Sequence, residues 1–337
     1  LGLRLTAYWN DDDGWHENQF DGSDVQAVEQ QMIRGTLVWE PTDRTELVLR
    51  YENTDIDGDG PVAQSHTNGS GIPGSPFNAK RDSFDANYDL VGEQSIETDF
   101  FTAELNVDVD FGDGTITALY GWRDNDSRSN SDIDAQPVSL FHAPADLLAE
   151  QNSFELRYNG EFGKANITTG VYWFENDIEY HERRNLLGAL TPIVSNGLLD
   201  DIPYQIQDGG GLYDVETMAF FAAMDYALTD RLTLTAGARW SSEEKSAEIA
   251  TLALNTNVLL IPETIVGGQP AYVNPLTGTD TRCNIVDSGN CFLDFKDDDK
   301  WDTFAPKLGL SYALSDESQL YGHWSRGFRS GGYNLRN

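Results

Sequence analysis

The fold is decided by Phe101-Thr-Ala-Glu-Leu-Asn-Val-Asp-Val109, followed by Asp110-Phe-Gly-Asp-Gly114 and then Thr115-Ile-Thr-Ala-Leu-Tyr-Gly-Trp122. In the first arm, apolar side chains at every second position alternate with polar ones. A period of two residues is that of a β-strand, and the Asp/Gly-rich segment between the arms is typical of a tight turn. This stretch therefore predicts a β-hairpin with one apolar face that ends at Trp122.

The same hairpin pattern recurs along the chain. Five short turns are expected near Glu40–Arg44, Asp110–Gly114, Asn159–Lys164, Leu228–Arg231 and Leu314–Ser318. Each joins strands of roughly eight to fourteen residues, and with an opening strand at Leu1–Asn10 the pattern predicts about 11 strands. The other connections are long, at about 10–32, 54–97, 124–152, 177–215 and 245–300. Alternating short and long links favour an antiparallel transmembrane β-barrel with short periplasmic turns and long extracellular loops.

Aromatic residues mark both ends of the apolar face. One set directly precedes the short turns, and a second lies near the far ends of the strands: Trp39, Tyr158, Tyr226 and Tyr312 in the first, and Trp9, Trp122, Trp173, Trp240 and Trp324 in the second. Amphipathic rings settle at both interfaces of a bilayer, so these sets predict two aromatic girdles. The alternate positions carry charged residues, which suits a water-filled lumen.

Composition narrows the class of protein. The 337 residues contain no run of about 18 apolar residues, which excludes a transmembrane helix. The mean hydropathy of −0.46 does not exclude a barrel, whose strands are apolar only at alternate positions. With 56 acidic and 22 basic residues the net charge is −34, which argues against a nucleic-acid partner.

Two segments resemble a known family. Arg34-Gly-Thr-Leu-Val-Trp-Glu-Pro-Thr-Asp-Arg-Thr-Glu-Leu-Val-Leu49 is similar to the early barrel hairpin of TonB-dependent outer-membrane receptors. Phe304-Ala-Pro-Lys-Leu-Gly-Leu-Ser-Tyr312 and Leu320-Tyr-Gly-His-Trp-Ser-Arg-Gly-Phe-Arg-Ser-Gly-Gly-Tyr-Asn334 resemble their mid-barrel segment, and this second match is the more specific. The layout of the whole chain fits the resemblance.

The resemblance implies that residues 1–337 form part of a receptor β-barrel of about 22 strands, with the plug domain and the closing strands outside this chain. It further implies a Gram-negative outer-membrane location, contact with lipid and lipopolysaccharide, and active uptake energised through TonB. A ferric siderophore is the expected ligand, with vitamin B12, oligosaccharides and other metal chelates as alternatives. No catalytic residues are expected. A passive porin and a secreted, soluble all-β binding protein remain alternative functions.

Ligand-binding candidates are aromatic and basic residues where strands meet the outer loops. They are Trp15, His16, Arg123, Arg128, His181, Arg183 and Arg184. A second set of arginines alternates with the apolar face and is expected to line the lumen: Arg4, Arg34, Arg50, Arg123, Arg157 and Arg239. These arginines either pair with lumen acids or with the plug, or guide an anionic ligand. The second interpretation rests on the ability of guanidinium groups to form paired hydrogen bonds with carboxylates and catecholates.

Metal and cysteine motifs are weaker. Asp55-Ile-Asp-Gly-Asp-Gly60 matches the first half of a calcium-binding EF-hand loop through Asp55, Asp57 and Asp59, but its twelfth position is His66, so an acidic turn is the alternative. Calcium bound in this outer loop is the one cofactor that the sequence suggests. The five histidines, including His142, follow no metal-binding spacing and are interpreted as surface loop residues. Cys283 and Cys291 predict a local disulfide and an oxidising compartment, with two free thiols as the alternative.

Overall fold

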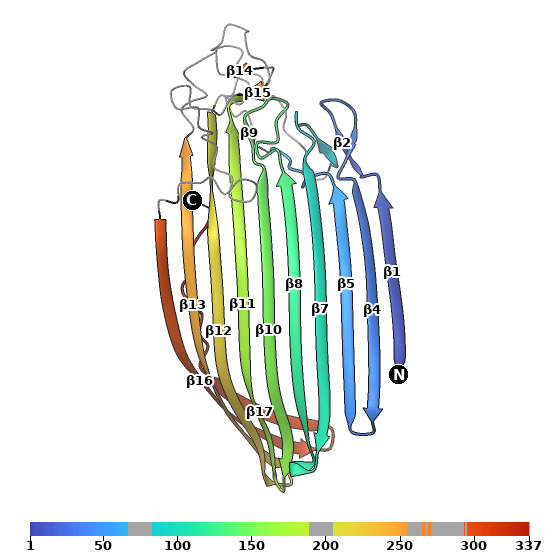
Figure 1. Cartoon of the computed structure of the whole chain (residues 1–337), viewed down its shortest axis with the longest axis vertical. Helices are drawn as coiled ribbons and strands as arrows, with labels where there is room; N and C mark the ends of the chain where they lie inside the picture. Colours follow the sequence, from blue (N-terminus) through green and yellow to red (C-terminus); the bar gives the residue numbers. More distant parts are fainter. Residues whose placement is uncertain are drawn as a thin grey trace.

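The computed structural model describes residues 1–66, 83–188, 205–254, 265–266, 269–270, 293 and 295–336. Within these residues, 12 strands form one antiparallel sheet, and all but the two-residue β9 lie side by side in chain order (Figure 1). The long strands are β1 (Gly2–Asp12), β4 (Val28–Thr42), β5 (Thr45–Gly58), β7 (Glu93–Val109), β8 (Gly114–Asn130), β10 (Ala145–Phe162), β11 (Ala165–Leu186), β12 (Gln205–Thr229), β13 (Leu232–Leu254), β16 (Phe295–Ser315) and β17 (Ser318–Ser325). The predicted set of eleven long antiparallel strands is confirmed.

The five short turns also lie where they are predicted, along one edge of the curved sheet, with the described parts of the long connections along the other (Figure 1). A 3₁₀ turn, η1 (Phe111–Asp113), joins β7 to β8, and Gly112 in it has a φ of 65° that suits glycine. Tyr158 in β10 donates its hydroxyl hydrogen to the Phe111 carbonyl oxygen at 2.6 Å, and the Phe162 ring lies 4.8 Å from the Phe111 ring. These contacts hold the turn against the neighbouring strand.

The strands are longer than predicted. β12 has 25 residues and β13 has 23, against the expected eight to fourteen. In β8, the polar run from Asp124 to Ser129 falls in a predicted long connection, yet it is paired with β7 on one side and with β10 on the other. Hydrophobic alternation disappears there because both faces meet water, whereas the backbone ladder continues.

The two faces of the sheet differ as expected. Register places Phe101 opposite Trp122, Tyr120 opposite Phe154, and Phe220 opposite Trp240, so these rings share the outer face. Many apolar side chains on that face are exposed, including Leu3 at 71% and Trp324 at 62%. Exposed apolar area of this extent fits a wall that faces hydrocarbon. Among the described residues, no helix is long and apolar enough to cross a membrane.

The apolar band has a defined upper limit. Trp122 donates its indole N–H to Glu150 Oε1 at 3.1 Å, and Trp173 donates to Glu216 Oε1 at 3.3 Å. Tyr120 likewise donates to Asn152 Oδ1 at 2.8 Å. Each aromatic side chain is therefore bonded to a polar group further along the wall, as expected where hydrocarbon gives way to the interface.

The described outer connections contain two small sheets. β2 (His16–Asn18) pairs with β3 (Asp24–Val25) and with β6 (Asp85–Ala86) in a three-stranded sheet, and β14 (Ile265–Val266) pairs with β15 (Gln269–Pro270). Val25 of β3, Ala86 of β6 and the nearby Tyr88 form a buried cluster. Asn18 donates from Nδ2 to the Tyr88 carbonyl oxygen at 3.0 Å and fixes the segment before β7.

Candidate functional site

A guanidinium group over two aromatic rings stands out on the lumen face of the wall. Arg239 in β13 lies opposite Phe221 in β12, which lies opposite Gly170 in β11. The Arg239 Cζ atom is 5.2 Å from the centre of the Tyr172 ring and 6.0 Å from that of Phe221. Cation–π contacts of this kind hold a guanidinium group while its N–H groups stay available. Arg239 Nε donates to Ser241 Oγ at 3.0 Å.

Four of the six predicted lumen arginines divide into two groups. Arg34 is ion-paired with Glu52, and Arg157 Nη1 lies 3.0 Å from Glu155 Oε1, as the lumen-acid interpretation expects. Arg239 and Arg123, in contrast, have no carboxylate partner among the residues that the structure describes; Arg123 Nη2 donates only to Asn125 Oδ1 at 3.4 Å. The second group therefore keeps hydrogen-bond donors that no described carboxylate occupies.

Trp15 and His16 lie at the outer rim, in and beside β2. The Trp15 ring stacks on Phe84 at 5.6 Å and meets the His16 ring edge-on at 5.9 Å. Trp15 is 68% exposed and is held by a hydrogen bond from Nε1 to Gln26 Oε1 at 3.0 Å. Sequence reasoning missed Phe84, whose only signal is an aromatic residue within a polar segment. The three rings form an exposed aromatic surface.

The other candidates lie along β8 and β11. Arg128 shares the outer face of β8 with Trp122, and its Nε is 3.4 Å from Asp126 Oδ1. His181 is almost buried beside Asp146, with Nδ1 3.5 Å from Oδ2. β11 lies six strands along the sheet from β1, so the structure does not bring His181, Arg183 and Arg184 next to Trp15 and His16 through sheet pairing.

A buried glutamate accompanies this basic group. Glu182 accepts hydrogen bonds from Arg184 Nε at 2.8 Å, from Arg336 Nε at 2.6 Å and from the Tyr180 hydroxyl at 2.9 Å. Burial alone raises the pKa of Glu182, but these hydrogen bonds outweigh burial and lower its pKa. Arg184 therefore already has a carboxylate partner, unlike Arg123 and Arg239.

The predicted calcium motif adopts an extended form. Asp55 and Asp57 lie within β5, and Asp59 Oδ2 accepts a hydrogen bond from the backbone N–H of Ala27 at 2.9 Å. Burial, followed by the charge of Asp57, raises the pKa of Asp55. Calcium binding by these aspartates stays a prediction. Cys283 and Cys291 lie outside the described residues.

Sequence reasoning missed a cluster of Asp89, Asp132 and His142. His142 Nε2 is 3.2 Å from Asp89 Oδ1 and 3.9 Å from Asp132 Oδ2. Asp132 is 5% exposed, and burial, followed by the charge of Asp134, raises the pKa of Asp132 to about 7. No spacing rule could have found this cluster, because its members come from two connections that are distant in the sequence.

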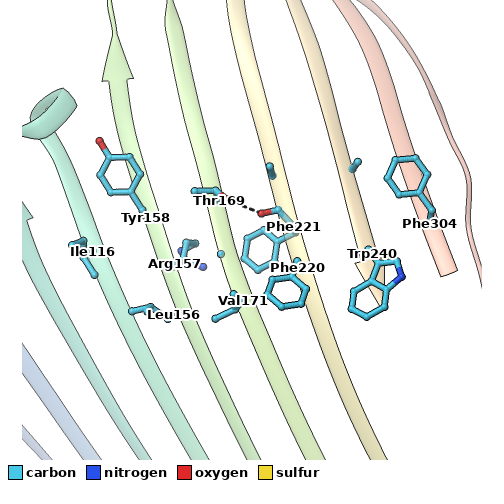
Figure 2. A pocket seen from close by; sticks show the side chains of 13 residues that line it. Ile116, Leu156, Arg157, Tyr158, Thr169, Val171, Phe220, Phe221, Trp240 and Phe304 are labelled. Carbon is cyan, nitrogen blue, oxygen red and sulfur yellow. Dashed lines mark hydrogen bonds between the residues drawn. The ribbon is translucent and has the colours of Figure 1, made fainter. Parts of the chain in front are cut away.

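The outer face carries an apolar depression of about 570 Å³ (Figure 2). Leu156, Val171, Phe220 and Trp240 line it from successive strands, and Thr169 donates its hydroxyl hydrogen to the Phe221 carbonyl oxygen at 3.0 Å beside it. It lies within the apolar band, and its lining matches the acyl chains of lipids rather than a polar solute. The lumen face and the rim are therefore the candidate ligand sites.

Solved structures with the same fold include siderophore uptake receptors and a copper transporter. The ferric yersiniabactin uptake receptor FyuA from Yersinia pestis matches with a TM-score of 0.68 and 16% identity, over 99% of this chain and 43% of that one. The siderophore receptor PiuA from Acinetobacter baumannii matches with a TM-score of 0.65 and 12% identity. The match covers 96% of this chain and 44% of PiuA. The copper transporter OprC matches with a TM-score of 0.57 and 10% identity, and the match covers 96% of this chain and 41% of OprC. The chain thus spans less than half the length of these structures.

A comparison with curated protein sequences gives no match. The family described as TonB dependent receptor-like, beta-barrel, matches residues 34–337, which is most of the chain. The match agrees with the antiparallel strand order and the turn positions described above. The chain therefore belongs to the TonB-dependent receptor β-barrel family of the Gram-negative outer membrane.

Proposed function

We propose that this chain supplies the ligand-contacting wall of an outer-membrane receptor that takes up a ferric siderophore, energised through TonB. The observation that carries the proposal is Arg239, held over Tyr172 and Phe221 on the lumen face without a carboxylate partner in the described part of the chain. A guanidinium group beside aromatic rings matches the carboxylates and catecholates of iron chelators. Arg123 is the second donor in this proposal, and Trp15 and His16 provide the outer contact.

The charge of the chain sharpens this assignment. A net charge of −34 repels anions over most of the surface, so an anionic chelate needs specific cationic groups inside the mouth. Arg239 and Arg123 are such groups, because their charge is not already cancelled by an adjacent acid. No bond is made or broken in the ligand under this proposal, and the wall contributes binding and orientation only.

The proposal extends to the whole protein. A plug domain, a TonB-contacting segment and the closing strands complete the receptor, in keeping with the share of the matched structures that this chain covers. Ligand binding at the wall and plug then precedes passage through the lumen. Two of the matched structures are receptors for ferric yersiniabactin and for a siderophore, which supports an iron chelate as the ligand, and the copper transporter has the same fold.

The test is uptake of a panel of iron-labelled siderophores by cells that express the receptor as their sole receptor of this class. We expect Arg239→Ala and Arg123→Ala each to weaken binding of one panel member about tenfold or more, since a charge-assisted hydrogen bond contributes ~1.5–3 kcal/mol. Arg44→Ala is the matched control, because Arg44 is ion-paired with Asp110 at the opposite, short-turn edge. Unchanged binding in both lumen variants contradicts the assigned site.

Energy dependence separates the proposed receptor from a passive porin. Uptake should fall to background in a strain that lacks TonB, while binding to the cell surface persists. Solute entry that is unaffected by the loss of TonB supports the porin instead.

A further inference from the structure

The connections outside the membrane contain a three-donor cluster that the uptake proposal does not use. Asp89 lies between β6 and β7, Asp132 follows β8, and His142 is in β9 (Phe141–His142), which pairs with β11. The donor atoms Asp89 Oδ1, Asp132 Oδ2 and His142 Nε2 all lie within 4.8 Å of one another. Two separate outer connections therefore meet at this point.

An unpaired buried oxygen shows that the cluster is incomplete without a ligand. Asp132 Oδ1 accepts a hydrogen bond from the backbone N–H of Ala135 at 2.8 Å, whereas Asp132 Oδ2 is buried without a hydrogen-bond partner. The Asp132 side chain is only 3% exposed, so water does not freely satisfy this oxygen. Leaving a buried carboxylate oxygen unpaired is costly, and Oδ2 is directed toward His142 Nε2.

The local charge also favours a cation. Within the described part of the chain, the ion pairs of Asp89 and Asp132 are with His142 alone. Asp134 adds a third carboxylate nearby but uses both oxygens to accept backbone N–H groups, including that of Phe141 at 2.6 Å. One imidazole thus faces two carboxyl groups in a half-buried site, and a bound cation would stabilise the ionised form of both.

The spacing and the donor types select a class of metal. Zn²⁺ binds imidazole nitrogen and carboxylate oxygen at ~2.0–2.2 Å, which places neighbouring ligands ~3–4 Å apart. The separations of 3.2 and 3.9 Å from His142 Nε2 are in that range. Ca²⁺ and Mg²⁺ prefer oxygen ligands throughout, whereas imidazole suits zinc and other first-row transition metals.

We propose that Asp89, Asp132 and His142 form a binding site for a divalent transition-metal ion of the zinc class, which cross-links two outer connections of the receptor. The bound ion satisfies Asp132 Oδ2 and joins the segment before β7 to the connection between β8 and β10. It is a resident ion that fixes the outer loops, separate from the cargo that the lumen wall binds.

The experiment measures metal content and affinity in the receptor purified in detergent, stripped with EDTA and dialysed against Zn²⁺, Mn²⁺, Ca²⁺ or Mg²⁺. We expect one Zn²⁺ per receptor in the intact protein, and at least tenfold weaker zinc binding in Asp132→Asn and in His142→Gln. Asp126→Asn and His323→Gln are the matched controls, because each removes an exposed acid or histidine outside the cluster. Both controls should bind zinc as the unchanged receptor does.

A structural readout accompanies the metal measurement. Hydrogen exchange in residues 83–92 and 131–143 should slow on addition of Zn²⁺ in the intact receptor, and not in the His142→Gln variant. This readout also shows whether a variant has kept its fold, since exchange in the β8 ladder should be unchanged.

Two results would overturn the site. Zinc binding that is equal in the cluster variants and the controls means that Asp89 and His142 form a simple hydrogen-bonded pair. Displacement of Zn²⁺ by an equal concentration of Ca²⁺ means that the imidazole is not a ligand. Neither result depends on siderophore uptake, so failure of this inference and failure of the transport proposal are distinguishable.

Discussion

At the scale of single residues, Gly170 decides how the lumen wall is built. A Cβ atom at Gly170 would lie 2.6 Å from the Leu156 carbonyl oxygen and 2.6 Å from Phe221 Cζ. The absence of a side chain therefore leaves room for the Phe221 ring beside β11, and this ring is one of the two that Arg239 contacts. A cationic group on the lumen face thus depends on a glycine two strands away.

We expect Gly170→Ala to destabilise the protein by about 1–3 kcal/mol, because backbone of β10 has to move to admit the methyl group. The measurement is the thermal unfolding midpoint of the receptor in detergent, followed by circular dichroism. Gly322→Ala in β17 is the control, since a Cβ there would meet nothing within 4 Å. An equal midpoint for the two variants would show that β10 and Phe221 relax without cost.

At the scale of the elements, the long strands change solvent along their length without changing structure. In β8, Ile116 and Tyr120 face hydrocarbon, whereas Asp124 and Asp126 on the same face are beyond the Trp122–Glu150 hydrogen bond. Side-chain periodicity follows the surrounding solvent, and backbone pairing does not. The number and order of strands could therefore be predicted from the apolar alternation, but the outer ends of the strands could not.

Hydrogen exchange should show this continuity. Backbone amides in residues 123–130 are expected to exchange slowly, in step with Gly114–Trp122 of the same strand, because neighbours on both sides complete the ladder. Residues 61–66 have no regular secondary structure, and their rapid amide exchange is the reference for comparison. Exchange of 123–130 at the rate of that reference would show that the strand ends at the membrane interface.

The candidate site was predictable only in part. Arg123 and Arg239 were assigned to the lumen because both alternate with apolar residues, and register confirms that placement. The cation–π contact needs Gly170 and Phe221 from other strands, and no local pattern carries that information. The cluster around His142 is even harder to predict from the sequence, because Asp89 and Asp132 approach each other only through the packing of two outer connections.

At the scale of the whole molecule, the wall separates two environments. Trp240 is on the outer face in line with Phe220, whereas Trp301 is on the lumen face, where Lys245 Nζ lies 5.6 Å from its ring centre. The same protein therefore contains indole groups that meet lipid and indole groups that do not. This difference gives a direct test of orientation in the membrane.

Single-tryptophan variants reconstituted with brominated lipid should differ accordingly. We expect strong fluorescence quenching when Trp240 is the sole tryptophan and little quenching when Trp301 is, because bromine atoms on acyl chains reach only the outer face. A variant that keeps Trp122 alone should respond most to bromine placed near the headgroups. Strong quenching of Trp301 would reverse the assignment of the two faces.

The bonds from Trp122 to Glu150 and from Trp173 to Glu216 have a consequence for the neighbouring bilayer. A thicker bilayer cannot simply cover this wall, because its extra hydrocarbon would surround two carboxylates. The lipids next to the protein must shorten instead, at a cost that grows with each ångström of mismatch. The thickness of the apolar band of the receptor thereby sets the hydrocarbon thickness of the adjacent leaflet. Proteins whose apolar bands have the same thickness need no further bilayer deformation when they lie beside it.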